Sequence, residues 1–449
     1  MLAILPLLLC LQSEMSLTTI RQCSHIIVAC LRVTGRVTML SLSRWAGDGG
    51  SYRTIQRFFS SCLPWPQLFW LFFRSHLFDP SDVYLLAGDE TVVTKSGKHT
   101  HGLDRFFASL YGKPVPGLAF FTLSLISTKQ RRSFPIVLEQ VIRSAAQKKS
   151  PATQTTPEAS TAQPKRSGGR PKGSRTQNKT EPLLSPELTH IQHMLRSLVA
   201  RIAGVIAPCY LVMDGHFGTN AAMQMVRQCH LHLITKLRCD SELYLVYQGP
   251  QAACGRRRKY GERFSFHAPP AHTLQNTSTQ NQIETRIYQS EMLHKSFGTP
   301  INVVVIVKTH LITKRRAHVV LVTSDLSLGY ETLIDYYGLR YQIEFNFRDA
   351  KQHWGLEDWM NVTEAAVTNS ANLSLFLVNV SQRLVRDKRH EQADSSVLDL
   401  KAEYRGSKYV EEVIKLLPEK PEPVLFERIL AKISQLGRIH APLSLPISP

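Results

Sequence analysis

The residues best suited to chemistry lie in the segment YGLRYQIEFNFRDAK, at positions 337–351. At about 3.6 residues per turn, this spacing predicts an amphipathic helix with an apolar stripe opposite a polar face. The apolar stripe carries Leu339, Ile343 and Ala350. The polar face carries a phenol, a carboxylate and two basic side chains within roughly 60° around the helix axis. These residues are Tyr337, Arg340, Glu344 and Lys351, and Arg348 lies next to them. Such a face suits a metal ion held beside a phosphodiester, and the alternative is an ordinary solvated helix face.

Two aspartates upstream each follow a short apolar segment. Residues 82–88, DVYLLAG, predict a strand that ends at Asp89, and residues 207–213, APCYLVM, predict a buried strand that ends at Asp214. A carboxylate at the end of a buried strand is held by the sheet while it faces the open edge, which suits metal binding. Glu90 competes with Asp89, but adjacent strand residues point to opposite faces, so only one would face a site. The alternative reading of Asp89 is a turn residue.

Composition favours a folded protein with a polyanionic partner. The chain has 449 residues, 43% of them apolar, and a formal net charge of +19, which predicts two to four domains and favours nucleic acid as a partner. Its eight cysteines form no CxxC pair, which is typical of a reducing compartment. No apolar run reaches the length needed to span a bilayer as a helix. The sequence contains no GxxxxGK[ST] motif, so we do not expect an ATP-driven activity. We therefore expect a cytoplasmic protein that does not enter a membrane.

The first 78 residues predict helices throughout. The glycine turn at 47–50 separates two of them, with Ser51 as the N-cap of the second. That second helix bears Arg53 and Arg57, an arrangement expected of a helix-turn-helix that contacts DNA. A small helical bundle is the alternative.

A second basic region follows the first predicted strands. Residues 143–180 hold nine Lys or Arg against Glu158 alone and almost no large apolar side chains, which predicts a disordered insertion. Within it GGRPKGSR, with Arg170 and Lys172, is similar to an Arg-Pro hook that lies in the minor groove. A flexible basic linker with non-specific phosphate contacts is the alternative.

The remaining pattern predicts a split α/β core. Helix and strand alternate from 186 to 237, strand follows strand from 240 to 325, and the chain after 362 is helical with a core helix at NLSLFLVNVSQRLV. We read Asp325, at the end of the last of these strands, as the cap of the next turn. The predicted divisions are a helical domain at 1–78, core segments at 79–142, 186–235 and 326–380, a basic insertion at 143–185, a β-rich insertion at 236–325, and a helical region at 381–449.

The spacing Tyr-x2-Arg-x3-Glu-x6-Lys from Tyr337 to Lys351 resembles the motif of bacterial insertion-sequence transposases of the DDE superfamily. The resemblance implies an RNase H-like mixed sheet flanked by helices, with a β-rich insertion and an N-terminal helical domain. It also implies that Asp89, Asp214 and Glu344 form a catalytic triad that holds Mg²⁺, with Mn²⁺ as a substitute.

The same resemblance implies cut-and-paste transposition, with double-stranded DNA as the partner at the transposon ends and the target, and a homodimer in the synaptic complex. Tyr337, Arg340, Arg348 and Lys351 would hold DNA. Family members that form a hairpin use a tryptophan in the β-rich insertion, and here none occurs between Trp70 and Trp354, so Tyr260 would replace it or the step differs. A non-mobile nuclease of the same fold and a catalytically decayed DNA-binding protein are the alternatives.

Overall fold

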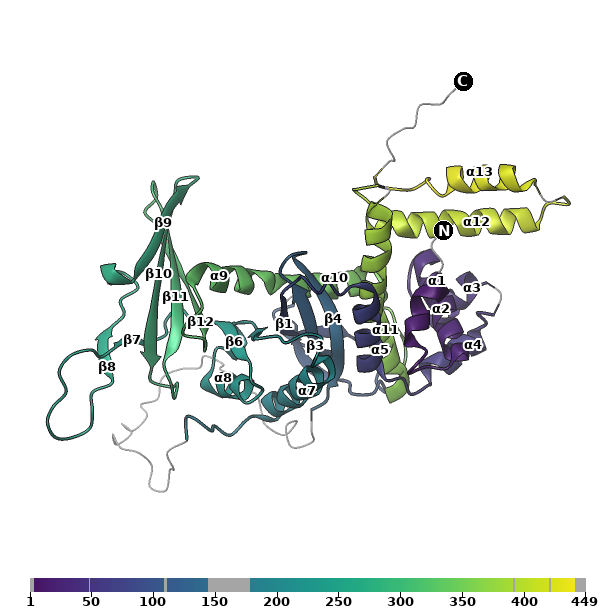
Figure 1. Cartoon of the computed structure of the whole chain (residues 1–449). Helices are drawn as coiled ribbons and strands as arrows, with labels where there is room; N and C mark the ends of the chain where they lie inside the picture. The colour runs from purple at the N-terminus through teal and green to yellow at the C-terminus, as the bar shows by residue number, and fades with distance from the viewer. Residues whose placement is uncertain are drawn as a thin grey trace, which may run out of the picture. The chain divides into compact units, whose positions relative to one another are not determined.

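The computed structural model describes residues 4–47, 49–108, 111–143, 178–390, 392–419 and 421–440 (Figure 1). The chain divides into two compact units. The first unit comprises Met1–Val141, Arg201–Ala207 and Tyr341–Pro449, and the second comprises Ile142–Ala200 and Pro208–Arg340. The first unit therefore joins the two ends of the chain, while the second is built from its middle.

The N-terminal part of the first unit is helical, which confirms the prediction for this region. Its helices are α1 (Ile4–Leu8), the 3-10 turn η1 (Leu9–Leu11), α2 (Leu17–Arg32), α3 (Met39–Trp45), α4 (Tyr52–Phe59) and α5 (Trp65–His76). Ser16, Thr38 and Ser51 are the N-caps of α2, α3 and α4, and each side-chain oxygen accepts a backbone N–H three residues later. The N-cap predicted for Ser51 is thus confirmed.

The strands of the first unit form an antiparallel set. They are β1 (Tyr84–Thr94), β2 (Asp104–Ala108), β3 (Lys113–Ser127) and β4 (Arg132–Val141). The long β3 pairs with β1, with β2 and with β4. At the end of the β1–β3 ladder Gly117 faces Thr94, and a Cβ at Gly117 would lie 2.5 Å from the Val93 carbonyl oxygen. Because only glycine allows this approach, position 117 fixes the register of the strand that carries Asp89.

The C-terminal part of the first unit is helical, and two of its helices cover β4. The helices are α10 (Tyr341–His353), α11 (Glu364–Arg389), α12 (Val397–Lys415) and α13 (Pro423–Ile433). α5, α10 and α11 all contact β4. The Asn346 side chain of α10 donates to the Ser133 hydroxyl at 2.8 Å, and that of Asn379 in α11 donates to the Pro135 carbonyl at 2.8 Å. These bonds satisfy buried polar groups, and the core helix predicted for 372–385 is confirmed as part of α11.

The second unit holds the remaining strands. Its elements are α7 (Pro186–Ile202), β5 (Tyr210–Val212), η2 (Gly215–Phe217), α8 (Asn220–Arg227), β6 (His232–Leu237), β7 (Leu243–Val246), β8 (Tyr260–Arg263), η3 (Ala271–Thr273), β9 (Leu274–Gln280), β10 (Ile283–His294), β11 (Ile301–His310), β12 (Arg316–Thr323) and α9 (Tyr330–Leu339). The last two residues of α7, Arg201 and Ile202, belong to the first unit. The strand order is β5-β6-β12-β11-β10-β7-β8, and β9 pairs with β10. β5 and β6 are parallel, whereas β6 and β12 are antiparallel.

This combination of a mixed sheet with flanking helices confirms the predicted α/β class and is consistent with an RNase H-like fold. The strands predicted at 241–248, 284–290, 301–310 and 317–323 are present as β7, β10, β11 and β12, whereas β8 and β9 were not predicted. The finer division into seven segments stays a prediction. Within the described ranges, every helix is too short or too polar to cross a bilayer.

Candidate active site

Asp89 lies inside a strand, not at its end. β1 runs from Tyr84 to Thr94, and Asp89 pairs with Thr122 of β3. The prediction of a strand that stops at residue 88 is therefore wrong, because the β-branched run from Thr91 to Thr94 continues the strand. Asp89 is half-buried and Glu90 is exposed, and an Asp89 carboxylate oxygen accepts the Glu90 N–H at 2.8 Å.

Asp214 follows β5 as predicted, one residue after Met213. It is the N-cap of η2, where its carboxylate accepts the His216 N–H at 3.0 Å. Its carbonyl oxygen accepts a hydrogen bond from the Thr235 hydroxyl of β6 at 2.6 Å. The chain then passes so close to β6 that a Cβ at Gly218 would lie 2.5 Å from the Lys236 carbonyl oxygen. Asp214 is thus half-exposed on a tight turn that β6 supports.

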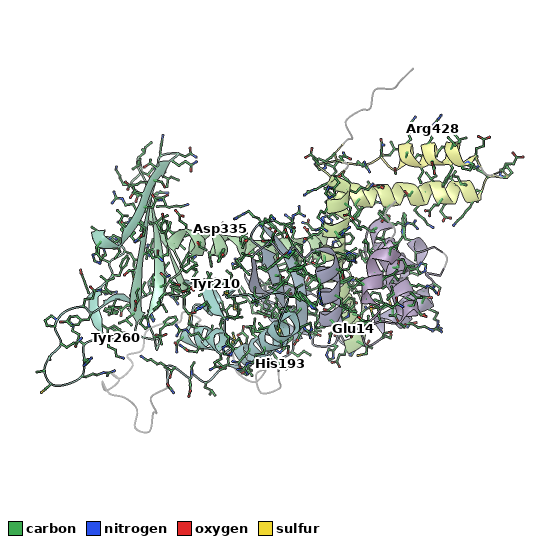
Figure 2. All side chains as sticks on the ribbon, viewed as in Figure 1. Glu14, His193, Tyr210, Tyr260, Asp335 and Arg428 are labelled. Atoms are coloured by element: carbon green, nitrogen blue, oxygen red, sulfur yellow. The ribbon has the colours of Figure 1, made fainter. Side chains whose placement is uncertain are left out.

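Asp325 caps a turn, which confirms its predicted structural role. Its carboxylate accepts the Ser327 N–H at 2.9 Å and the Ser327 hydroxyl at 2.7 Å. Tyr210, labelled in Figure 2, donates its hydroxyl to the other carboxylate oxygen at 2.6 Å. Burial opposes ionisation of Asp325, but these hydrogen bonds outweigh it and lower the pKa.

Glu344 lies on a shorter helix than predicted. The single helix expected over 337–351 is two helices, because α9 ends at Leu339 and α10 begins at Tyr341. Between them the Arg340 N–H bonds to the Tyr337 carbonyl, three residues back, which tightens the last turn of α9 and ends it. Glu344 is exposed in the first turn of α10, where the helix dipole favours a carboxylate.

The predicted polar face is exposed only in part. Arg340 is only 8% exposed, in contrast to the solvent-facing position expected for it. Tyr337 is half-buried against the apolar cluster of Val304, Leu321 and Leu333. Arg348 is exposed, donates to Asp349 and lies over the Phe345 ring. The predicted apolar stripe is buried as expected.

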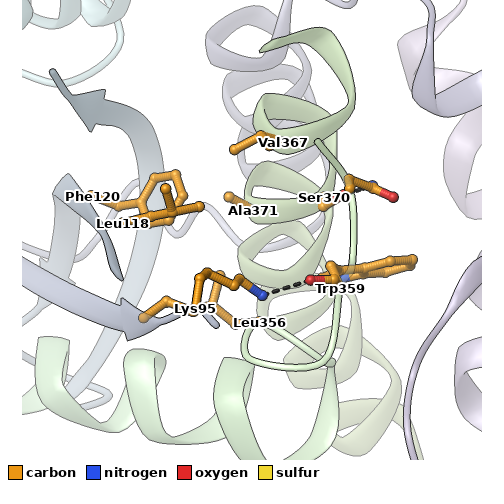
Figure 3. A pocket seen from close by; sticks show the side chains of 10 residues that line it. Lys95, Leu118, Phe120, Leu356, Trp359, Val367, Ser370 and Ala371 are labelled. Carbon is orange, nitrogen blue, oxygen red and sulfur yellow. Dashed lines mark hydrogen bonds between the residues drawn. The ribbon is translucent and has the colours of Figure 1, made fainter. Parts of the chain in front are cut away.

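Two lysines form hydrogen bonds between β1 and the region of α10. One lies on α10 and bonds to β1, and the other follows β1 and bonds to the segment after α10. The Lys351 ammonium group donates to the Val92 carbonyl at 2.9 Å and pairs with the Glu357 carboxylate at 3.1 Å. The Lys95 ammonium group, one residue past β1, donates to the Trp359 carbonyl at 2.6 Å, as Figure 3 shows. α10 also contacts β1. The strand with Asp89 and the helix with Glu344 are thus held together within the first unit.

Sequence reasoning did not single out Lys95. It follows a strand whose length was underestimated, and its partners are backbone carbonyls more than 260 positions away. No local pattern signals such a contact. The one sequence feature that could have indicated its role is its position directly after β1, which ends at Thr94.

The predicted metal ligands belong to different units. Asp89 and Glu344 lie in the first unit and Asp214 in the second. Among the residues that the structure describes, no group of three His, Cys, Asp or Glu side chains is placed so that it could hold a metal ion. As a donor set, three carboxylates without thiol or imidazole suit a hard divalent cation such as magnesium.

The predicted DNA-binding residues of the N-terminal region lie on α4. Arg53 and Arg57 are exposed there, and α4 contacts α3 across the glycine turn. Arg170 and Lys172, and with them the predicted disorder of the basic insertion, lie outside the described residues.

Comparison with known proteins gives one family. The family model described as DDE superfamily endonuclease matches residues 10–296. No curated protein matches the chain. The matched range contains Asp89 and Asp214 and ends before Glu344. Because the match covers more than half of the 449 residues, the chain belongs to the DDE superfamily endonucleases.

Proposed function

We propose that this endonuclease is a transposase that cuts DNA at the ends of an insertion sequence and transfers the cut strand to target DNA. The observation that carries the proposal is the attachment of α10 to β1, because it ties Glu344 to the strand of Asp89. Family membership supports a nucleic-acid cleavage reaction, and the net charge of +19 supports a polyanionic substrate.

Asp89, Asp214 and Glu344 are the residues we assign to the metal. They would hold divalent magnesium, or manganese in its place, which supplies activation of the attacking hydroxyl and stabilisation of the leaving oxygen. Asp89 offers a carboxylate whose backbone the sheet holds, and Glu344 one on the first turn of a helix. Asp214 completes the set from its turn after β5.

The basic residues are assigned to DNA. Tyr337, Arg340, Arg348 and Lys351 would hold the phosphates of the transposon end by charge-assisted hydrogen bonds. Arg53 and Arg57 would contact DNA from α4, and Arg170 and Lys172 from the basic insertion. Cleavage at two ends also calls for a homodimer in the synaptic complex.

The test replaces each acid by its amide. Asp89→Asn, Asp214→Asn and Glu344→Gln should each lower magnesium-dependent strand cleavage by at least about a thousandfold, because a lost metal ligand removes several kcal/mol of transition-state stabilisation. DNA binding measured without metal should persist.

Asp325→Asn is the matched control, since Asp325, like Asp214, follows a strand and caps a turn but is not assigned to the metal. Its cleavage rate should stay within about threefold of the unchanged protein. Wild-type cleavage in any of the three amide variants would refute the assignment of that acid.

A nuclease that does not mobilise DNA is the second candidate, because the family is described as an endonuclease. The two differ in products. A transposase joins the cut end to a second DNA molecule, whereas a simple nuclease releases ends without joining them. Inverted repeats beside the gene would favour the transposase, and end-specific binding without cleavage would indicate a catalytically decayed protein.

A further inference from the structure

A basic cavity lies on the first unit. It has a volume of about 380 Å³ and is lined by residues of β4, α10, α11 and the start of α12. On α10 the lining includes Asn346 and Asp349, which lie roughly 140° to 160° around the helix from Glu344, and also Arg348, which lies one turn after Glu344 on nearly the same side. Glu344 itself does not line the cavity, so the cavity adjoins the carboxylate assigned to metal without including it.

The lining carries more positive than negative charge. Arg132, Arg348 and Arg389 face Asp349, the one acidic side chain among the described lining residues. Asp349 is already paired with Arg348 at 3.0 Å. In the described part of the chain, neither Arg132 nor Arg389 forms an ion pair with a carboxylate.

Two further observations show that these charges are held close together. Burial first, and then the neighbouring Arg389, lower the pKa of Arg132. The Arg389 side chain is fixed by a hydrogen bond of 3.0 Å to the Ser395 carbonyl. Burial also lowers the pKa of His353, so its ring is neutral at pH 7 and does not add to the charge. Asp349 acts to raise the pKa of Arg132, but its carboxylate is paired with Arg348. Three arginines thus share one acid, and an anion would relieve their repulsion.

The N-terminus of α12 adds to the positive potential. α12 has 19 residues and begins at Val397, and Val397 and Leu398 line the cavity together with the N-cap Ser396. The first N–H groups of a helix have no partner within the helix, and they favour an anion. The capping box carboxylate, Asp399, bonds to Ser396 and to the His440 ring, and it does not line this cavity.

We propose that this cavity is a binding site for phosphate groups, formed by Arg132, Arg389 and the N-terminus of α12. Guanidinium groups bind phosphate oxygens in pairs of parallel hydrogen bonds, and backbone N–H groups supply further donors. At the rim Phe345 is 44% exposed and stacks with Arg348 at 4.7 Å, an arrangement that also accepts the base of a nucleotide. The phosphate comes from a DNA backbone or from a free phosphate compound.

The first experiment measures binding of inorganic pyrophosphate to the full chain by calorimetry, without divalent metal. Arg132→Gln and Arg389→Gln should each weaken binding at least about tenfold, because each removes a charge-assisted contact. Arg132→Lys and Arg389→Lys should recover part of the affinity. Arg428→Gln is the control, since Arg428 is exposed on α13 outside the cavity (Figure 2). Its replacement should leave the affinity for pyrophosphate unchanged. Thermal melting of each variant checks the fold.

The second experiment identifies the source of the phosphate. Binding of a labelled DNA duplex is measured by anisotropy at several salt concentrations. If the cavity takes a backbone phosphate, each Gln variant should reduce the slope of log affinity against log salt by about 0.9. An unchanged slope together with lost pyrophosphate binding would assign the site to a free phosphate compound.

Wild-type behaviour of both Gln variants in both experiments would overturn the proposal. Because neither measurement includes a divalent metal, this result is independent of the cleavage test of Asp89, Asp214 and Glu344.

Discussion

Lysine side chains near the candidate site stabilise structure through backbone carbonyls. Lys351 bonds to Val92, and Lys95 bonds to Trp359 and Glu357. In the sequence Lys351 matches the last position of a family motif and suggests a phosphate contact. Its ammonium group joins α10 to β1, so Lys351 also has a structural role.

Replacement of Lys351 by methionine tests this structural role. The change keeps the length of the side chain but leaves the Val92 carbonyl without its donor, so we expect a loss of about 1–3 kcal/mol in the free energy of unfolding. The contribution of the half-exposed Glu357 should be small. Urea denaturation measures the change. Lys432→Met, at an exposed position on α13, should shift stability by less than about 0.5 kcal/mol, and an equally small shift for Lys351→Met would contradict the role.

At the scale of elements, α4 is the clearest candidate for insertion into a DNA groove. Ile55, Phe58 and Phe59 are buried, while Arg53, Gln56 and Arg57 are exposed. The helix therefore has an apolar side for packing and a basic side for contact, as a recognition helix requires.

Charge removal on α4 tests that contact. Arg53→Gln and Arg57→Gln should each weaken binding to duplex DNA and lower the slope of log affinity against log salt by about 0.9, because each removes one phosphate contact. Stability should change by less than about 0.5 kcal/mol, since both side chains are exposed. Anisotropy titrations at several salt concentrations provide the measurement. Arg21→Gln on the exposed side of α2 is the control, and slopes equal to that control would exclude α4 from the interface.

The sequence predicted the presence of the helices, strands and turns around the candidate site better than it predicted where they end. The Ser51 cap, the strand before Asp214 and the turn at Asp325 follow from local hydrogen bonding, which short motifs encode. The end of β1 and the break at Arg340 were missed. The β-branched run from Thr91 to Thr94 was a local signal for the longer strand, which pairing with β3 extends, whereas the backbone bond from Arg340 to Tyr337 that ends α9 has no such signal. The cavity around Arg132 and Arg389 joins residues 257 positions apart, so periodicity along the chain could not predict it.

At the scale of the molecule, a buried lysine of the first unit links α12 to the end of α10. Lys401 of α12 is only 8% exposed, donates to the His353 carbonyl at 2.9 Å and lies 4.9 Å from the centre of the Trp354 ring. Burial lowers the pKa of Lys401 to about 8, while the neighbouring Arg405 adds to this decrease and Asp358 opposes it. Cys30 stays neutral, because burial raises its pKa to about 12.

This depressed pKa predicts that stability rises with pH between about 8 and 10.5. In that window the unfolded chain holds the Lys401 proton and the folded chain does not, so the free energy of unfolding increases as pH rises. Lys401→Met removes the effect. Between pH 7 and pH 10, the free energy of unfolding of the wild type should rise by about 1–3 kcal/mol more than that of the variant. Urea denaturation at several pH values measures this difference. A difference between the two proteins that does not depend on pH would show that Lys401 does not titrate in this range.

The place of Asp89 within β1 affects which changes in chain length the site would tolerate. Pairing with β3 is continuous from Tyr84 to Thr94, so one residue inserted before Asp89 would turn its side chain to the opposite face of the sheet. Asp214 lies instead on a turn after the three-residue strand β5. Residues inserted after Phe217 would lengthen this turn without changing the side of the sheet on which Asp214 lies. Related chains should therefore keep the length of β1 and vary in length after Asp214.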